Sequence, residues 1–174
     1  LAEVADCYRK AIELQPQNFN LCVDLARALD DQHHFEEALA VLRKLEGAGP
    51  AAVSVSLFQQ GSLFARWGLQ DQAANCFLKL AGTSYGDNPA VRMALGQSFA
   101  LLGKREPATQ SLKAIPQFAN EYIPAQVLLA RMADGVDAKL AILRALTQVK
   151  PGVQGVLIEE MQVLLAAKRP ADAV

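Results

Sequence analysis

The chain has 174 residues, of which 52% are hydrophobic and 20% charged, and its formal net charge is −1. This composition is typical of a globular protein and excludes an intrinsically disordered one. Lysine and arginine are scattered rather than clustered, and no apolar run reaches the roughly 20 residues that span a bilayer. We therefore expect no nucleic-acid partner and no membrane insertion of this segment.

The first predicted elements form a helical hairpin. Residues 19–31 and 36–45 both carry apolar residues at helical spacing, and the polar residues 32–34 between them predict a short turn. The two helices must therefore run antiparallel.

The next two units follow the same plan. Gly68 and Gly103 occupy the predicted turns, where glycine adopts a left-handed backbone at low cost. Asn88 followed by Pro89 predicts a helix start with an N-cap and a first-turn proline. Pro107 suits the first turn of a second helix, and Pro116 should end that helix early.

A repeat of 35 residues underlies these elements. Four landmarks recur at this spacing: Ala26, Gly61 and Gly96; Leu29, Phe64 and Phe99; Ala38, Ala73 and Ala108; Leu42, Phe77 and Leu112. We expect the small residues to lie where two helices of a hairpin cross closely, with Gly61 facing Ala73. Large residues such as Phe64 and Phe77 would fill the space between one hairpin and the next.

These landmarks resemble those of the tetratricopeptide repeat (TPR) family. In residues 1–18, Tyr8, Ala11 and Pro16 match a second helix, and the three later units supply the small, large and alanine positions in order. The resemblance implies an all-α, right-handed α-solenoid of antiparallel helix hairpins. No Trp begins any unit, and Pro116 interrupts the third.

We expect one solenoid over residues 1–174, divided at repeat boundaries. The predicted parts are the second helix of a truncated repeat (1–18), three repeats (19–53, 54–88 and 89–119), a degenerate repeat (120–153) and the first helix of a truncated repeat (154–174). Leu129-Ala130 and Ala138-Ile142-Ala145 are the landmarks of the degenerate repeat. Residues 168–174 resemble the start of another second helix. Both ends therefore indicate a fragment of a longer, bacterial-type array.

Few residues suggest chemistry, and we predict no enzymatic activity, cofactor or metal. The sequence contains no phosphate-binding glycine loop, Gly-x-Ser-x-Gly motif or zinc-type Cys/His spacing. Asp30, Asp31, His33 and His34 form one dense cluster of ligand-type side chains, which we interpret as charge compensation in a turn rather than a metal site. Trp67 is expected to pack across its turn rather than to serve as an exposed binding anchor.

The three cysteines give a weak indication of compartment. Cys7, Cys22 and Cys76 show no Cys-x-x-Cys spacing and cannot all pair. We expect them to be small buried hydrophobic residues, although one disulfide with a spare thiol stays open. The odd number favours a reducing compartment, but the choice between cytoplasm and periplasm stays open.

The resemblance also implies a binding surface, because the first helices of the family line a concave groove that takes a peptide or helix of a partner. Carried onto this sequence, the expected groove residues are Asn20, Val23, Arg27, Asp30, Val55, Phe58, Ser62, Arg66, Met93, Gln97, Val127 and Arg131.

One column of this groove is apolar throughout: Val23, Phe58, Met93 and Val127. An uncovered apolar column favours a partner with an apolar helix or extended segment, with acidic flanks near Arg27 and Arg131. The alternative is that neighbouring helices of the solenoid cover this column. The Lys/Asn carboxylate clamp of the chaperone-binding branch is missing at the matching positions.

The predicted function is a non-catalytic protein-protein interaction scaffold within a larger assembly, such as a bacterial exopolysaccharide export, secretion or pilus-assembly machine. An alternative is a regulatory or substrate-recruiting arm of an enzyme whose catalytic domain lies outside this segment. Self-association through truncated ends is a third option.

Overall fold

The computed structural model describes residues 2–167, which form helices and turns and contain no β-strand. The chain divides into two compact units, Leu1–Gly86 and Asp87–Val174. The predicted all-α class is confirmed. The predicted second-helix start at 168–174 lies outside the described residues.

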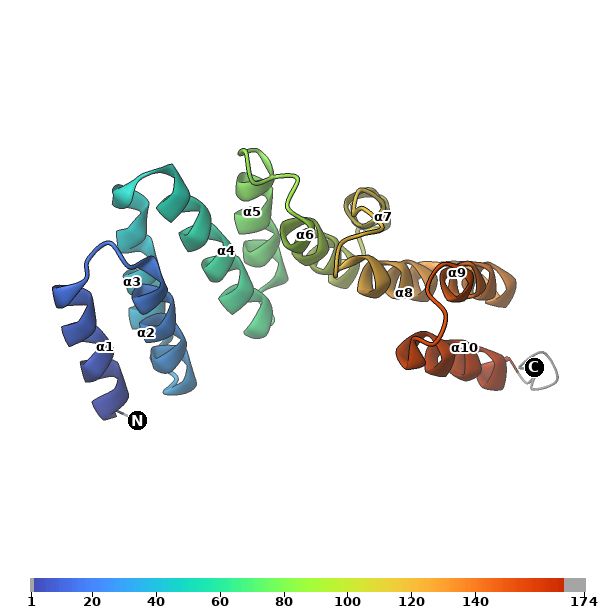
Figure 1. Cartoon of the computed structure of the whole chain (residues 1–174), viewed down its shortest axis with the longest axis horizontal. Helices are drawn as coiled ribbons and strands as arrows, with labels where there is room; N and C mark the ends of the chain where they lie inside the picture. Colours follow the sequence, from blue (N-terminus) through green and yellow to red (C-terminus); the bar gives the residue numbers. More distant parts are fainter. Residues whose placement is uncertain (1, 168–174) are drawn as a thin grey trace. The chain divides into compact units, whose positions relative to one another are not determined.

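Over residues 2–86, unit 1 contains five helices and a short 3₁₀ segment, η1. Figure 1 labels the five helices. Their bounds are α1 Ala2–Leu14, α2 Phe19–Asp31, α3 Phe35–Lys44, η1 Leu45–Ala48, α4 Pro50–Arg66 and α5 Gln70–Ala81. Helices α2 and α3 pack as one hairpin, α4 and α5 as the next, and α1 packs on α2. Helix α4 begins at Pro50, four residues before the predicted repeat boundary at residue 54.

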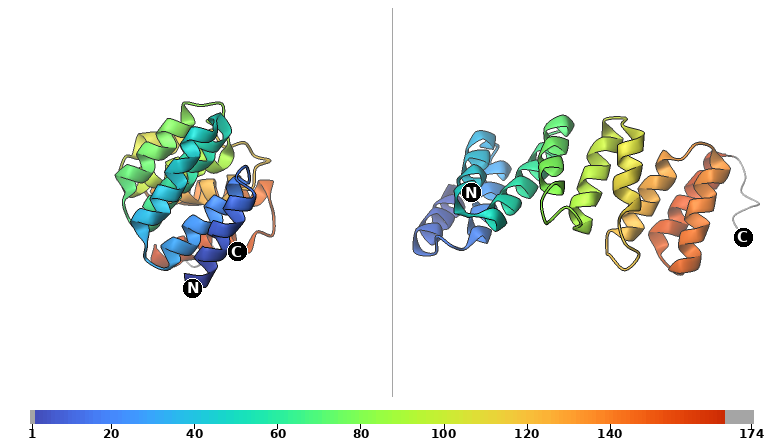
Figure 2. Two further views of the ribbon diagram at one scale, coloured as in Figure 1. Left: turned by 90° about the vertical axis from the view of Figure 1, so that its left-hand side faces the viewer. Right: turned by 90° about the horizontal axis from the view of Figure 1, so that it is seen from above.

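Over residues 87–167, unit 2 repeats the arrangement with five further helices. Figure 2 shows them in green to red. Their bounds are α6 Pro89–Leu101, α7 Arg105–Lys113, α8 Tyr122–Met132, α9 Val136–Val149 and α10 Gln154–Ala166. Helices α6 and α7 form one hairpin, α8 and α9 form another, and α10 packs on α9. Asn88 caps α6 through a 2.9 Å hydrogen bond from the Ala90 amide, as predicted.

The landmark alanines occupy equivalent surroundings. Ala38, Ala73 and Ala108 are all fully buried, and the amide of each donates to the carbonyl four residues earlier. The turns before them match as well, since His33, Gly68 and Gly103 all have a left-handed backbone with φ of 63°, 77° and 71°. The 35-residue repeat therefore describes real structural equivalence.

The close crossing within a hairpin differs from our expectation. A Cβ added at Gly61 would lie 2.7 Å from the Phe77 ring, and one at Gly96 would lie 2.7 Å from the Leu112 side chain. The small residue of the first helix thus lies nearest to the bulky landmark of the second helix, and at Gly96 the Ala108 carbonyl follows at 3.5 Å. Phe77 consequently packs inside its own hairpin, where its ring also lies edge-on to Phe58 with centroids 5.8 Å apart.

The degenerate hairpin α8–α9 needs a second correction. Leu129 and Ala130 are buried as predicted, but Ala138 and Ala145 are exposed. The buried face of α9 is instead formed by Leu140, Leu143 and Leu146. The reason is the short connection through Gly135, which begins α9 directly and sets a different helical face toward α8.

The three cysteines are free, and their burial differs. Cys22 is buried as predicted, Cys76 is half-buried, and Cys7 is exposed, so the prediction is wrong for Cys7. Burial raises the pKa of the Cys22 and Cys76 thiols above the ordinary value.

Candidate functional site

Helix α2 carries four of the predicted groove residues, and the structure separates them into two pairs. Asn20 and Arg27 are exposed. Val23 is only 6% exposed and belongs to the core of unit 1, and Asp30 is 4% exposed. A partner cannot reach Val23 or Asp30 in the folded chain, so both are corrected from groove residues to internal ones. For Val23, the alternative that neighbouring helices cover the apolar column is the right one.

Asp30 joins the first hairpin to the second. Its Oδ1 accepts a 2.6 Å hydrogen bond from the indole Nε1 of Trp67, and its Oδ2 lies 2.9 Å from Nη1 of Arg66. A carboxylate at a helix C-terminus opposes the helix dipole, and the indole hydrogen bond together with the charge of Arg66 offsets that cost. Trp67 also packs on Phe35 with ring centroids 4.9 Å apart. The expectation that Trp67 packs rather than projects is confirmed.

Helix α4 presents its predicted groove residues along one side. Val55, Phe58 and Ser62 are half-buried and follow one another at helical spacing, and Arg66 is exposed. The Phe58 ring packs edge-on against Phe77, with centroids 5.8 Å apart. These residues keep part of their surface free, so a partner could contact them.

In unit 2, the apolar groove residues also rest on the core. Met93 packs against the cluster around Leu112, and Val127 packs against the cluster around Leu143, although both stay half-buried. Gln97 is exposed. The apolar column is therefore only partly available to a partner.

Arg27 and Arg131, which we expect to meet acidic residues of a partner, also contact carboxylates within the chain, and the two contacts differ in distance. Arg131 holds Glu159 through hydrogen bonds of 2.8 and 2.7 Å, and this contact lowers the pKa of the Glu159 carboxyl. Arg27 lies 3.9 Å from Asp24, a weak contact between exposed side chains. Arg27 is thus the freer of the two cations.

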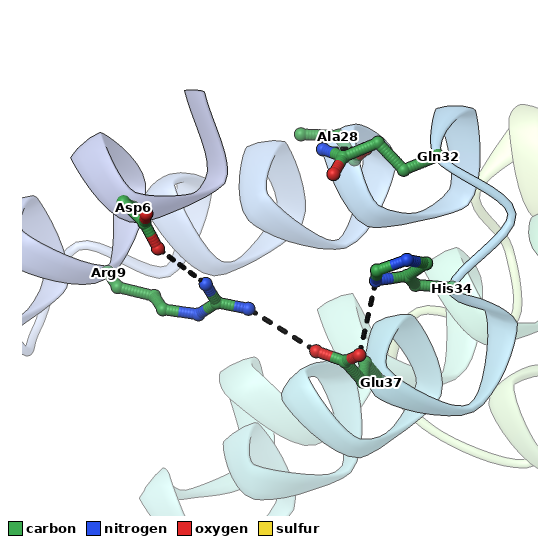
Figure 3. Close-up of polar contacts among 6 residues, drawn as sticks. All are labelled: Asp6, Arg9, Ala28, Gln32, His34 and Glu37. Atoms are coloured by element: carbon green, nitrogen blue, oxygen red, sulfur yellow. Dashed lines mark hydrogen bonds and ion pairs between the residues drawn. The ribbon is translucent and has the colours of Figure 1, made fainter. Parts of the chain in front are cut away.

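The Asp/His cluster is divided among different contacts. His34 Nδ1 lies 3.1 Å from the Glu37 carboxylate, which also accepts from Arg9 of α1 at 3.3 Å (Figure 3). Asp30 points instead to Trp67 and Arg66. Among the described residues, no group of three or more His, Cys, Asp or Glu side chains could hold a metal ion.

A groove on another side of α4 was not predicted from the sequence. It is an open cavity of about 550 Å³ between α3 and α5, with α4 as its floor. We call it the α4 groove, and its lining residues are Arg43, Glu46, Val53, Leu57, Gln60, Phe64, Gln72, Asn75, Cys76 and Lys79.

A second cavity of about 370 Å³ adjoins the α4 groove, because both are lined by Glu46 and Val53. It reaches Pro50 at the start of α4 and Tyr85 in the following loop. The sequence signal for the α4 groove is the helical spacing of Val53, Leu57 and Phe64, of which we assign only Phe64 from the sequence, to the space between hairpins.

Hydrogen bonds hold the polar side chains on the floor of the α4 groove in place. Gln60 is 5% exposed and donates through Nε2 to Glu46 Oε1 at 2.9 Å and to Ser56 Oγ at 2.8 Å. Ser56 in turn donates to the Leu42 carbonyl at 2.7 Å. A buried network with its donors satisfied is rigid, so the Gln60 amide and the Glu46 carboxylate are held in place.

The fold has close counterparts among solved structures. A tetratricopeptide repeat protein from Parabacteroides merdae matches 97% of this chain over 68% of its own, at 18% identity and a TM-score of 0.74. YrrB, a TPR protein with an unusual peptide-binding site, matches 98% of this chain over 88% of its own, at 19% identity and a TM-score of 0.66. A thermophilic TPR protein of Thermus thermophilus matches 92% of this chain over 89% of its own, at 19% identity and a TM-score of 0.64.

The chain has a tetratricopeptide-repeat fold. Within this TPR fold, α2, α4, α6 and α8 are the first helices of their hairpins, and α3, α5, α7 and α9 are the second helices. No protein-family model matches the sequence, and no curated protein matches it. No helix of the described part of this TPR chain combines the length and apolarity needed to cross a bilayer.

Proposed function

We propose that this TPR chain is a non-catalytic scaffold that binds a peptide or helix of a partner protein on its first helices. The observation that carries the proposal lies in unit 1, on the side of α4 opposite to the α4 groove. We call it the first-helix surface, and Val55, Phe58 and Ser62 are only partly buried there. Helix α2, which contacts α4, leaves Asn20 and Arg27 exposed beside it. Apolar surface flanked by polar and cationic groups suits an amphipathic or extended segment.

The proposed surface is therefore smaller than the sequence-derived set. In unit 1 it comprises Asn20, Arg27, Val55, Phe58, Ser62 and Arg66. Unit 2 carries a set of its own, Met93, Gln97, Val127 and Arg131. The similar protein YrrB, whose peptide-binding site is described as unusual, supports peptides as a partner class.

The test uses a random twelve-residue peptide library displayed on phage and panned against the intact chain. Recovered peptides are resynthesised with a fluorescein label, and their affinities are measured by fluorescence anisotropy. The double variant Phe58→Glu with Met93→Glu should weaken binding by about tenfold or more, because it places charge in the apolar contact.

A matched control replaces two exposed apolar residues of second helices, Leu78→Glu with Val149→Glu, and should leave the affinity within about twofold. Equal affinities of the wild type and the folded Phe58/Met93 variant would refute the first-helix surface.

We further infer that the scaffold works within a larger assembly of the exopolysaccharide export, secretion or pilus-assembly type. The support is the Ala/Leu-rich style of its degenerate repeats. The sequence that flanks this segment in the intact protein tests it: an outer-membrane barrel or membrane anchor agrees with this inference, and a transferase or protease motif supports the enzyme-arm alternative.

A further inference from the structure

We propose that the α4 groove is a second peptide site, which takes an extended segment carrying an acidic residue. This second site rests on the proposed function only because both treat the chain as a peptide-binding protein. It lies on a different surface, since Val53, Leu57, Gln60 and Phe64 lie on the side of α4 opposite to Val55, Phe58 and Ser62 by helical spacing.

The length of the groove fits an extended backbone. From Val53 to Phe64 the floor runs for about 16 Å at the rise of an α-helix. An extended peptide covers this distance with about five residues. The adjoining cavity continues the floor to Pro50 and ends beside Tyr85, which is 42% exposed.

The lining matches the two kinds of group that such a peptide presents. Val53, Leu57 and Phe64 are half-buried and offer an apolar floor to its alternate side chains. Gln72 and Asn75 are exposed on the α5 wall, where their amides can both donate to and accept from a peptide backbone.

Charge decides which peptide is favoured. Arg43 on the α3 wall and Lys79 on the α5 wall are exposed, and neither forms an ion pair within residues 2–167. The one carboxylate of the lining, Glu46, already accepts from Gln60. The two free cations leave the groove with a net positive charge, so they attract an acidic side chain or a terminal carboxylate. Two cations are too few to hold a nucleic acid.

The first measurement compares two double variants against the library-derived, fluorescein-labelled peptides. Arg43→Glu with Lys79→Glu should weaken the acidic peptides by about tenfold or more, and added salt should weaken wild-type binding as well. Lys44→Glu with Lys113→Glu makes the same change of net charge outside the groove, and it should leave affinities within about twofold. All four residues are exposed, so both variants are expected to fold, which their thermal unfolding verifies.

The second measurement places the peptide through Cys76, which lines the groove and is half-buried. In a Cys7→Ser background the accessible exposed thiol is removed, and Cys22 is buried. A saturating acidic peptide should slow the alkylation of Cys76 by N-ethylmaleimide about fivefold or more, as expected for a covered thiol.

The outcomes separate this proposal from the previous one. One outcome would overturn the α4 groove and leave the first-helix surface standing. In that outcome, the peptides bind more weakly to the Phe58/Met93 variant, bind the Arg43/Lys79 variant as tightly as the wild type, and do not slow the alkylation of Cys76. Acidic peptides with the reverse pattern support the groove and count against that surface. A library that yields no binder above an unrelated helical protein overturns both.

Discussion

The two units connect their successive hairpins by different means. In unit 1, the contact between the first and second hairpins passes through Asp30, a buried carboxylate that is held by Trp67 and Arg66. In unit 2, the ion pair between the two hairpins joins Arg105 to Asp134, whose side chains are 52% and 86% exposed. Arg131 joins α8 to Glu159 of α10, whose side chain is 12% exposed.

The energetic consequence of this difference is large. Removing one partner of a buried charged contact leaves the others without hydrogen bonds, whereas an exposed pair is replaced by water at little cost. We therefore expect substitutions of the residues that connect the hairpins to lower the free energy of unfolding more in unit 1 than in unit 2.

The largest effect is expected at the buried joint. Asp30→Ala should lower the free energy of unfolding by about 3 kcal/mol, because the Trp67 indole N–H loses its buried acceptor and the Arg66 guanidinium loses its ion-pair partner. Chemical denaturation of the two proteins measures the change. Asp31→Ala removes the neighbouring exposed carboxylate and should stay within about 0.5 kcal/mol. Equal effects of the two substitutions would contradict the buried joint.

The close crossings should respond alike in both units. Gly61→Ala and Gly96→Ala should each cost about 2 kcal/mol, since the new methyl group would lie 2.7 Å from the Phe77 ring or the Leu112 side chain. Thermal unfolding of both variants gives the values. Gly47→Ala is the control, because nothing lies within 4 Å of its Cβ. A neutral Gly61→Ala would show that the small residue is not needed at the crossing.

The ion pair between α8 and α10 should matter less than Asp30, because Arg131 is 62% exposed, and it should depend on pH. Arg131→Gln should lower stability by about 0.2–1 kcal/mol at neutral pH and low salt. The bidentate contact with Arg131 holds the pKa of Glu159 below its ordinary value, so its contribution is present above the pKa of the unfolded chain. That contribution is lost as the pH falls through the lowered folded pKa. Urea unfolding across the acid range should show the difference vanish, and a constant difference would argue against the ion pair.

The smallest effect concerns the turns. His33 adopts the left-handed backbone that Gly68 and Gly103 adopt in the next two hairpins. His33→Gly should raise stability by about 0.5 kcal/mol, as relief of the backbone cost slightly exceeds the added freedom of the unfolded chain. Differential scanning calorimetry is sensitive enough to detect this change. A clear loss would mean that the edge-on contact of the His33 ring with Phe35 outweighs the strain.

Periodicity predicted the hairpins well, because landmark positions such as Ala73 and turn positions such as Gly68 depend on local backbone geometry. It failed where the outcome depends on which helix face meets a neighbour. The sequence could not show that Val23 is covered, that Gly61 faces Phe77, or that the core of α9 is formed by Leu143 and its neighbours.

The candidate surfaces were predicted less well for a related reason. A binding face is what packing leaves uncovered, so it depends on contacts between helices far apart in sequence. Trp67 was correctly expected to pack, but its partner Asp30 was assigned to a groove. The α4 groove escaped prediction because its walls come from α3 and α5, and only its floor has a sequence pattern.

Peptide binding by unit 1 can be mapped residue by residue through backbone amide chemical shifts. The ¹⁵N-labelled chain is titrated with a peptide recovered from the library. The expected result is saturable shift changes concentrated on α4 and on the helices that flank it, namely α2, α3 and α5. A spectrum unchanged at saturating peptide, or changes concentrated in α6–α10, would contradict peptide binding by unit 1.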